Sequence, residues 1–454
     1  MKFPKPLKLY KINKFMKTQI GTGGLITTLL LAAVLALTSC EKATPEDEEY
    51  LYDFHNHYTP TCSHQLLPDS MALYVDYTST LVMKAQLRFY WHVMKNIIVR
   101  KTKRYYAIKG QEITRTAGDV TELLRAVSNY ENPDLKGALD RIVNGDTEAM
   151  LLTDGEQLDQ KEPFLKEAFK KWLMKGHDIY IISDPYNDPK TQARRFMFYI
   201  LFYDAENPLN IADYTIRAAR LNQFPRVKRM KLSITPKVRG FHGGHSDPNS
   251  YVQAIVTRKG NMEVQEWNTD WEDKIERFIL HAKDNHGEEM PNGAVLLEGL
   301  QLDKSSITGV TITGVTAKAY NINELYTDYY TQRRAEQEVD SLPDWDACDN
   351  FILLNQDLFK RNANLQVFFD RQNWNPEFLT GKPYNYFKIA FFVTEMEEHL
   401  EKFRDQLVFD DIINKGELNE SVFESVKQTI EDPEIIQFLA DTPFYAIYVK
   451  AQQR

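Results

Sequence analysis

Apolar residues follow two different spacings along the chain, and from about Ser70 to Asn222 these spacings alternate. Short, almost continuous apolar runs predict buried strands at Met71–Val75, Arg104–Ile108, Glu148–Thr153, Asp178–Ser183 and Phe196–Tyr203. Apolar residues three and four positions apart predict helices at Thr80–Val99, Val120–Val127, Leu135–Val143, Pro163–Lys175 and Asn210–Leu221. Strands of this kind alternating with helices indicate a parallel sheet with helices on both faces. We therefore expect an α/β domain over residues 69–223, with a doubly wound, mostly parallel sheet.

The spacing changes after about Phe224, where strand patterns become more frequent. Apolar runs, many with alternating polar residues, predict strands at Val227–Thr235, Tyr251–Thr257, Met262–Trp267, Val295–Leu300, Val310–Ala319, Leu365–Asp370, Tyr386–Val393 and Phe444–Lys450. Helical spacing predicts helices at Asp270–Lys283, Glu397–Gln406 and Ser421–Ile430. We expect a second, strand-rich α+β domain over residues 224–454.

The first forty residues have the layout of an export signal. Six lysines without any acidic residue precede the apolar segment Leu25–Leu37. This segment is shorter than the about 20 apolar residues that a membrane-spanning helix needs. It runs into Leu37-Thr38-Ser39-Cys40, which resembles the bacterial lipobox, and the resemblance covers only this stretch. The resemblance implies a signal peptide over residues 1–39, cleavage before Cys40, and lipid attached to Cys40.

The stretch after Cys40 is expected to be a linker, over residues 40–68. Glu41–Tyr50 is polar and acidic and contains a proline, which is typical of a flexible tether. An acidic run at this place is also similar to surface-export signals in some Gram-negative lipoproteins. We therefore expect a lipid-anchored protein of the cell envelope, at the outer membrane, facing the periplasm or the outside.

Charge and cysteine content limit the kinds of partner. The formal net charge is −9, and it becomes −15 when residues 1–39 are removed. A chain this acidic lacks the basic footprint of nucleic-acid binding. Besides Cys40 the chain has only Cys62 and Cys348, so it has no disulfide framework. The two cysteines form either a single bridge or two buried thiols.

Two carboxylates follow predicted strands directly. Asp76 opens the segment Asp76-Tyr77-Thr78-Ser79-Thr80, and Asp154 follows the apolar run that ends at Thr153. In a parallel α/β sheet the carboxyl ends of the strands open into the crevice where ligands bind. Carboxylates and hydroxyls together form an all-oxygen set, which suits Mg²⁺.

These motifs, in this order, resemble the von Willebrand factor A-like family. Its metal-ion-dependent adhesion site combines a D-x-S/T-x-S/T motif after the first strand, a threonine from a later loop, and an aspartate in a T-D-G turn. Asp76, Thr78 and Thr80 match the first element, and Asp154 matches the third. The resemblance covers about a third of the chain. It implies a von Willebrand factor A-like fold and a divalent ion, Mg²⁺ or else Mn²⁺ or Ca²⁺.

The middle element of that site departs from the family's pattern. Glu131–Leu139 is similar to the family's loop and following helix, but Pro133 stands where a threonine is usual and has no hydroxyl. The resemblance implies a metal held by Asp76, Thr78, Thr80 and Asp154, with Asp134, or else Asn132, as the substitute for the missing threonine. A protein partner would complete the coordination with an acidic side chain, so the site would capture a partner rather than catalyse a reaction. The alternative is the same fold with a degenerate site, in which Asp76 caps a helix and Asp154 belongs to a turn.

Two further segments are similar to enzyme motifs. Asp53-Phe54-His55-Asn56-His57 is similar to the opening metal motif of the amidohydrolase and PHP phosphoesterase families, because His55 and His57 on one strand face could share Zn²⁺. The later histidine and aspartate motifs of those families do not assemble from the ten histidines of this chain. The glycine-rich segment Arg239–His245 resembles an oxyanion loop, but the chain lacks the G-x-S-x-G turn that it would serve.

We therefore expect a membrane-anchored cell-envelope lipoprotein that binds a protein or another macromolecule, through a divalent-metal site, and not an enzyme. Two alternatives stay open. One is a structural subunit of an envelope, secretion or fimbrial assembly that uses the fold without metal. The other is a metal-dependent hydrolase built around His55 and His57.

Overall fold

The fold is described from a computed structural model of the chain. The structure describes residues 54, 67, 71–77, 87–93, 102–116, 130–158, 163–188, 191–205, 223–239, 262–264, 276–281, 289, 291–337, 350–381, 384–411 and 416–452. Across these residues, no helix has both the length and the apolar content that crossing a bilayer requires. The segment around Cys40 lies outside the described residues, so the lipid anchor stays a prediction.

The chain divides into two units. One consists of residues 1–49 and 325–339, and the other of residues 50–324 and 340–454. The described part of the first unit is almost entirely the helix α10 (Asn323–Arg334), in which the Arg334 guanidinium donates to the Tyr330 hydroxyl at 3.1 Å. Every described strand belongs to the second unit, which carries the sites discussed below.

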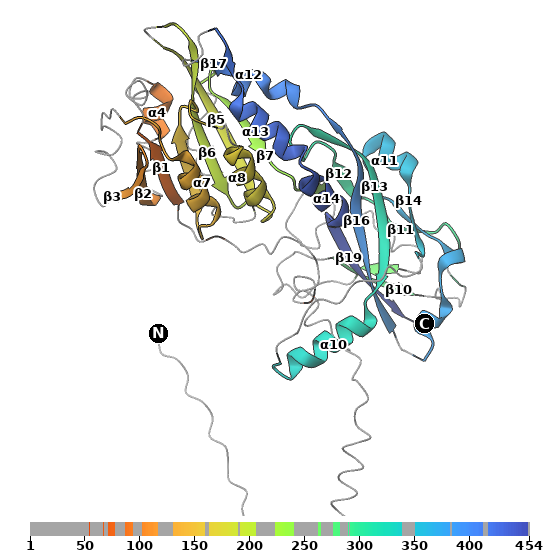
Figure 1. The fold of residues 1–454 in the computed structure, drawn as a ribbon. Helices are drawn as coiled ribbons and strands as arrows, with labels where there is room; N and C mark the ends of the chain where they lie inside the picture. Colours follow the sequence, from red (N-terminus) through yellow and green to blue (C-terminus); the bar gives the residue numbers. More distant parts are fainter. Residues whose placement is uncertain are drawn as a thin grey trace, which may run out of the picture. The chain divides into compact units, whose positions relative to one another are not determined.

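Seven strands form the first sheet of the second unit. They are β1 (Met71–Asp76), β2 (Thr102–Lys109), β3 (Glu112–Thr116), β4 (Glu148–Thr153), β5 (Asp178–Asn187), β6 (Arg194–Tyr203) and β7 (Lys228–Leu232). Their order across the sheet is β3-β2-β1-β4-β6-β5-β7 (Figure 1). β1 pairs in parallel with β2 and with β4, whereas the other four pairings are antiparallel.

The expected α/β architecture is therefore present as a mixed sheet, and the prediction of a mostly parallel sheet is wrong. Tight connections account for the difference: Gly110, at φ 59°, turns β2 into β3, and a short loop that includes Gln192, at φ 61°, joins β5 to β6. Strands joined by so few residues pair antiparallel. The sheet also extends beyond the expected boundary at residue 223, because β7 pairs with β5.

Helices cover both faces of the first sheet. α7 (Leu135–Val143) and α8 (Phe164–Leu173) pack on one face (Figure 1), and α4 (Arg88–Val93) packs on the other. α7, β4 and the later helix α13 (Ser421–Ile430) have the bounds that the apolar spacing predicts. Each face buries its own apolar side chains, which explains why β4 and β6 are apolar at almost every position.

The second half of the chain contributes four smaller sheets and several helices. A five-stranded sheet has the order β13-β16-β19-β10-β9, and the others are β11-β15-β14, β12-β8 and β17-β18. The strands are β8 (Lys237–Arg239), β9 (Met262–Val264), β10 (Glu276–His281), β11 (Val295–Leu297), β12 (Gln301–Asp303), β13 (Val310–Asn321), β14 (Ile352–Leu354), β15 (Val367–Phe369), β16 (Tyr384–Glu398), β17 (Phe409–Asp410), β18 (Leu418–Asn419) and β19 (Tyr445–Gln452). The helices besides α10 and α13 are α11 (Gln356–Asn362), α12 (Arg404–Leu407), α14 (Pro433–Asp441) and the 3₁₀ turns η5 (Arg371–Asn373), η6 (Pro376–Leu379) and η7 (Leu400–Phe403).

This half is strand-rich, as expected, but its helices are predicted less well. The patterns do not predict α10, α11 and α14, and the helix predicted at Glu397–Gln406 begins within β16. A helix is predicted at Asp270–Lys283, but the structure has the strand β10 there. β10 pairs in parallel with β19 and antiparallel with β9, so pairing with distant strands overrides the local helical spacing.

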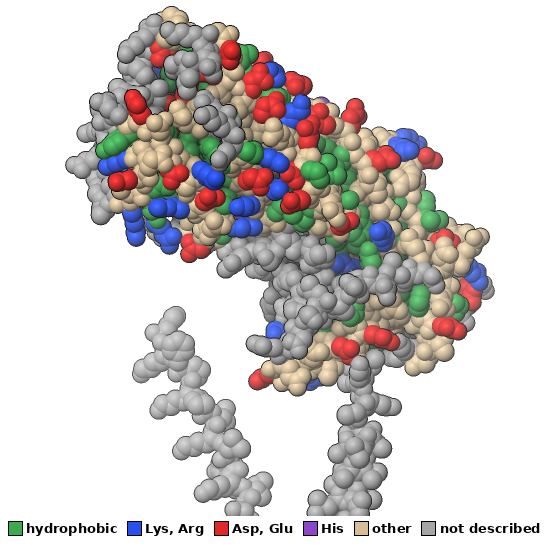
Figure 2. Space-filling model, viewed as in Figure 1, with side chains coloured by type: hydrophobic (Ala, Val, Ile, Leu, Met, Phe, Trp, Pro, Cys, Tyr) green, Lys and Arg blue, Asp and Glu red, His purple; other side chains and the backbone are tan. Residues whose placement is uncertain are grey.

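One apolar core joins the two halves of the chain. It runs from the α7 and α8 face of the first sheet through α13 to one face of β16 and β19. α13 packs directly on α8, and the Lys166 ammonium on α8 lies 2.7 Å from the Asp432 carboxylate that precedes α14. The regions expected as separate domains therefore share their interior. At the surface viewed in Figure 2, acidic and basic side chains lie among one another.

Candidate functional site

The strand order of the first sheet reverses at β1. β2 and β4 lie on opposite sides of it, and in sheets of this kind ligands bind outside the carboxyl ends of the strands at such a point. Asp76 ends β1 and Thr153 ends β4, and both side chains are buried. The Thr153 hydroxyl donates to Asp76 Oδ2 at 2.8 Å. This hydrogen bond fixes the ends of two strands that lie 77 positions apart in the sequence.

Asp154, the next residue, has different neighbours. Its Oδ1 accepts a hydrogen bond from the Glu156 amide at 3.2 Å, across the turn made by Gly155. Strand alternation assigns Asp76 to the α7 and α8 face of the sheet and Asp154 to the α4 face. Consistent with this, burial first and the Asp154 charge second raise the pKa of Tyr186. The two aspartates therefore meet at one edge but belong to opposite faces.

Asp134 lies at the same edge and caps a helix. Its backbone amide donates to the Gly110 carbonyl at 2.8 Å, just beyond β2, and its Oδ1 accepts from the Gly137 amide at 2.8 Å at the start of α7. Pro133 precedes it and is partly buried. The carboxylate of Asp134 thus serves the helix N-terminus, where an acidic side chain is favourable.

The predicted metal ligands are only partly brought together. Thr78 and Thr80 lie outside the described residues, as do His55, His57, Cys62 and Cys348. Within the described ranges, no group of three or more histidine, cysteine, aspartate or glutamate side chains is placed to hold a metal ion. These residues do not by themselves fit a divalent ion, because Asp134 caps a helix and Asp76 and Asp154 face different sides. The five-residue metal site stays a prediction.

A buried arginine stands beside this edge, on β6. Arg195 is fully buried, and its Nη1 forms an ion pair with Glu156 and donates to the Asp410 carbonyl at 3.2 Å. Its guanidinium carbon lies 5.1 Å from the centre of the Phe409 ring. Burial lowers the pKa of Arg195, and the nearby carboxylates, that of Asp154 first, oppose this effect. Arg195 therefore neutralises the acidic turn after β4.

A buried carboxyl and a phenol lie on the α4 face near the same edge. Burial raises the pKa of Asp184, on β5, to about 7. The hydroxyl of Tyr199, on β6, is fully buried, and its pKa is raised well above its usual value by burial first and by the charge of Asp184 second. In the described part of the chain, neither Asp184 Oδ2 nor the Tyr199 hydroxyl has a hydrogen-bond partner. Asp184 is therefore a carboxyl that changes its protonation near neutral pH.

Sequence reasoning missed Arg195, Asp184 and Tyr199. The available signal was a charged residue within or directly beside an apolar strand: Asp184 follows the run that ends at Ser183, and Arg195 precedes the run that begins at Phe196. Charged side chains in such places are buried only when paired or neutralised.

The edge as a whole is a set of polar groups held in fixed positions. Asp76 with Thr153, and Glu156 with Arg195, are paired within the protein. Such fixed groups need little reorganisation when a ligand binds, which favours affinity. The chain matches no protein-family model, no curated protein and no solved structure.

Replacing Arg195 by methionine should destabilise the fold by about 3–5 kcal/mol, because Glu156 and its acidic neighbours would stay buried without a cation. Urea unfolding of the full chain measures the loss. The matched change at the adjacent, exposed Arg194 should cost less than about 1 kcal/mol. Equal losses in the two variants would contradict the role assigned to Arg195.

Asp184→Asn should change the pH dependence of stability. The folded state holds the Asp184 proton up to about pH 7, whereas the unfolded chain releases it near 3.8, so wild-type stability falls as pH rises between these values. The variant lacks this loss, and its unfolding free energy relative to wild type should rise by roughly 2–4 kcal/mol from about pH 4 to about pH 8. Thermal unfolding across this range measures it, with Asp140→Asn, at an exposed site on α7, as the control. A difference that does not vary with pH would refute the raised pKa.

Proposed function

We propose that this chain is a lipid-anchored cell-envelope protein whose first sheet binds a partner protein at the edge that carries Asp76 and Asp154. The anchor is supported by the basic stretch, the apolar segment and the Leu37-Thr38-Ser39-Cys40 sequence. The binding edge is supported by the hydrogen bond from Thr153 to Asp76, at the point where the strand order reverses.

Binding in this proposal does not depend on a metal ion, because the Asp134 carboxylate caps α7 and Asp76 and Asp154 belong to opposite faces of the sheet. The ion pair of Arg195 with Glu156 already supplies a positive charge to the acidic edge. A divalent ion would have served the same electrostatic purpose. The hydrolase alternative rests on His55 and His57, which are not among the described residues, and the sheet edge adds no support to it.

Cys40→Ser should release the protein from the membrane. The wild-type chain, expressed whole in a Gram-negative host, should fractionate with membranes and have the mass of residues 40–454 plus lipid. The variant cannot accept the lipid and should appear in the soluble fraction without that added mass. Intact-mass spectrometry of both fractions measures this. An unchanged mass and unchanged membrane association of the variant would rule out the anchor.

The binding edge can be tested by photo-cross-linking from exposed positions in cells that make the full chain. Glu131 lies beside the carboxyl ends of the strands, close to Gly110, whereas Asp146 precedes β4 at the opposite edge. Both side chains are exposed. A cross-linking amino acid at position 131 should yield a discrete protein adduct, and one at position 146 should yield none.

Removing divalent ions with EDTA distinguishes metal-independent from metal-dependent binding of the partner. The adduct from position 131 should persist when EDTA is present during irradiation of permeabilised cells. Loss of the adduct with EDTA and its return with Mg²⁺ would contradict metal-independent binding and support the predicted metal site. Adducts from both positions, or from neither, would contradict the assignment of the edge.

A further inference from the structure

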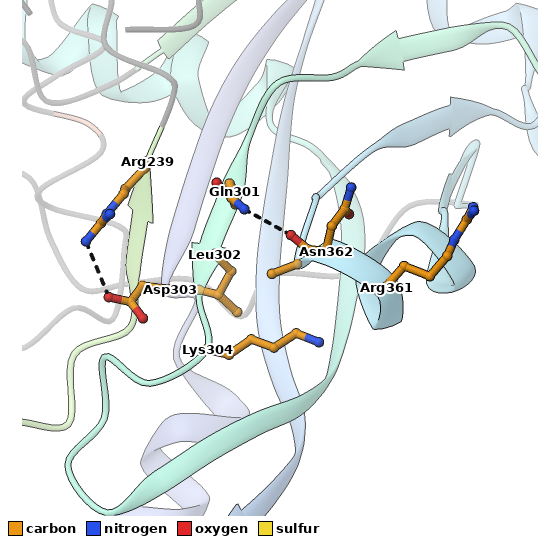
Figure 3. Close-up of a pocket in the computed structure, with 8 residues that line it drawn as sticks. Arg239, Gln301, Leu302, Asp303, Lys304, Arg361 and Asn362 are labelled. Atoms are coloured by element: carbon orange, nitrogen blue, oxygen red, sulfur yellow. Dashed lines mark hydrogen bonds and ion pairs between the residues drawn. The ribbon is translucent and has the colours of Figure 1, made fainter. Parts of the chain in front are cut away.

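A separate cavity of about 390 Å³ lies in the second half of the chain (Figure 3). Its walls come from β8, from β12 with the residue after it, and from the end of α11. None of these elements belongs to the first sheet, so the cavity is distinct from the edge that carries Asp76.

The floor of the cavity is apolar and held by backbone hydrogen bonds. Leu302 and Ala363 are buried there, and the Leu302 amide donates to the Ala363 carbonyl at 2.9 Å. Ala363 ends α11 in the left-handed conformation, at φ 63°, and its amide donates to the Phe359 carbonyl at 2.8 Å. The cavity is therefore built on fixed backbone rather than on mobile side chains.

The rim carries more positive than negative charge. Arg239, Lys304 and Arg361 line it, with Asp303 as the single acidic residue among its lining side chains. Arg239 is 76% exposed and lies 3.7 Å from Asp303, and an ion pair of this kind contributes less than about 1 kcal/mol. The three cations come from separate segments of the chain, β8, the residue after β12 and α11, and they line the same cavity.

Two of these cations also serve α11. Lys304 Nζ donates to the Lys360 carbonyl at 3.3 Å, and Arg361 Nε donates to the Asp357 carbonyl at 3.3 Å. Positive charge near a helix C-terminus is favourable, which accounts for both positions in part. Arg239 comes from β8 and, among the described residues, contacts Asp303 and no carbonyl of α11. The helix therefore does not explain Arg239.

Two amide side chains lie between Arg239 and Arg361 (Figure 3). Gln301 Nε2 donates to the Asn362 carbonyl at 3.0 Å, which holds the glutamine in place. Asn362 Oδ1 accepts from the Asn364 amide at 3.2 Å, which leaves Nδ2 of Asn362 without a partner among the described residues. The wall thus offers amide groups of the kind that bind hydroxyls.

We propose that this pocket binds an anionic sugar, a sugar ring that carries a carboxylate or phosphate group. The oxyanion lies against Arg239, and the more distant Lys304 and Arg361, whose side chains lie toward α11 (Figure 3), add to the positive field. Ring hydroxyls bind Asn362 and Gln301. The apolar side of the ring covers Leu302 and Ala363, a combination of apolar floor and few polar groups that is typical of small-ligand sites.

The test is titration calorimetry of the full chain with glucuronate, glucose 6-phosphate, glucose and inorganic phosphate. Saturable binding of glucuronate or of glucose 6-phosphate, with glucose and inorganic phosphate at least about tenfold weaker, is expected and identifies which oxyanion is preferred. Binding of neither anionic sugar would overturn the proposal. Glucose binding as well as glucuronate would overturn the anionic part, and inorganic phosphate binding as well as glucose 6-phosphate would overturn the sugar part.

Variants assign the binding to this pocket. Arg239→Met should weaken the anionic sugar by about tenfold or more, because it removes a charged hydrogen bond at an exposed side chain that the fold does not need. Asn362→Asp, which replaces the amide donor by a negative charge, should abolish binding. Lys318→Met is the matched control, since Lys318 is an exposed cation on β13 away from the cavity. Unchanged affinity in Arg239→Met, or an equal loss in Lys318→Met, would overturn the assignment.

Discussion

Arg195 buries a positive charge where β6 meets β17, and a buried charge is stable only when opposite charge lies close to it. Two groups supply that compensation: the Glu156 carboxylate, in the turn after β4, and the carbonyl of Asp410, on β17. They come from opposite halves of the chain, so the charge balance of the first sheet is complete only when the second half is in place. The ion pair between Lys166 and Asp432 joins α8 to the segment before α14 in the same way.

Around this junction the strand ends are held rigidly. Gly155 takes φ 81°, and a Cβ at that position would lie 2.8 Å from the Phe198 ring, so only glycine fits between β4 and the aromatic side chains beside Arg195. The hydrogen bond from the Thr153 hydroxyl to Asp76 in turn fixes the end of β1 against the end of β4. The candidate binding edge and the contact between the halves are therefore one connected structure, while the cationic cavity beside α11 lies apart from it.

The sequence predicted elements well where local pattern decides them. α7 has five buried apolar residues at helical spacing and a capping aspartate, and its bounds were predicted. The antiparallel pairing of β5 with β6 was not predicted. A strand buried on both faces is apolar throughout, so its sequence does not indicate whether it pairs parallel or antiparallel. Asp76 and Asp154 were placed at the correct strand ends. The sheet faces to which the two aspartates belong depend on strand register. The hydrogen bond of Arg195 joins it to a residue 215 positions away, and no local pattern encodes such a contact.

The contact between Arg195 and Asp410 also constrains the order of events as the chain is made. β6 ends at Tyr203, but β17 begins only at Phe409. Contacts this distant in sequence form late. Until β17 and α13 have been made, the first sheet holds a charge with incomplete compensation and an apolar face without α13. Because synthesis runs from the N-terminus, the first sheet is complete only after β17 and α13 have been made, more than 200 residues after β6.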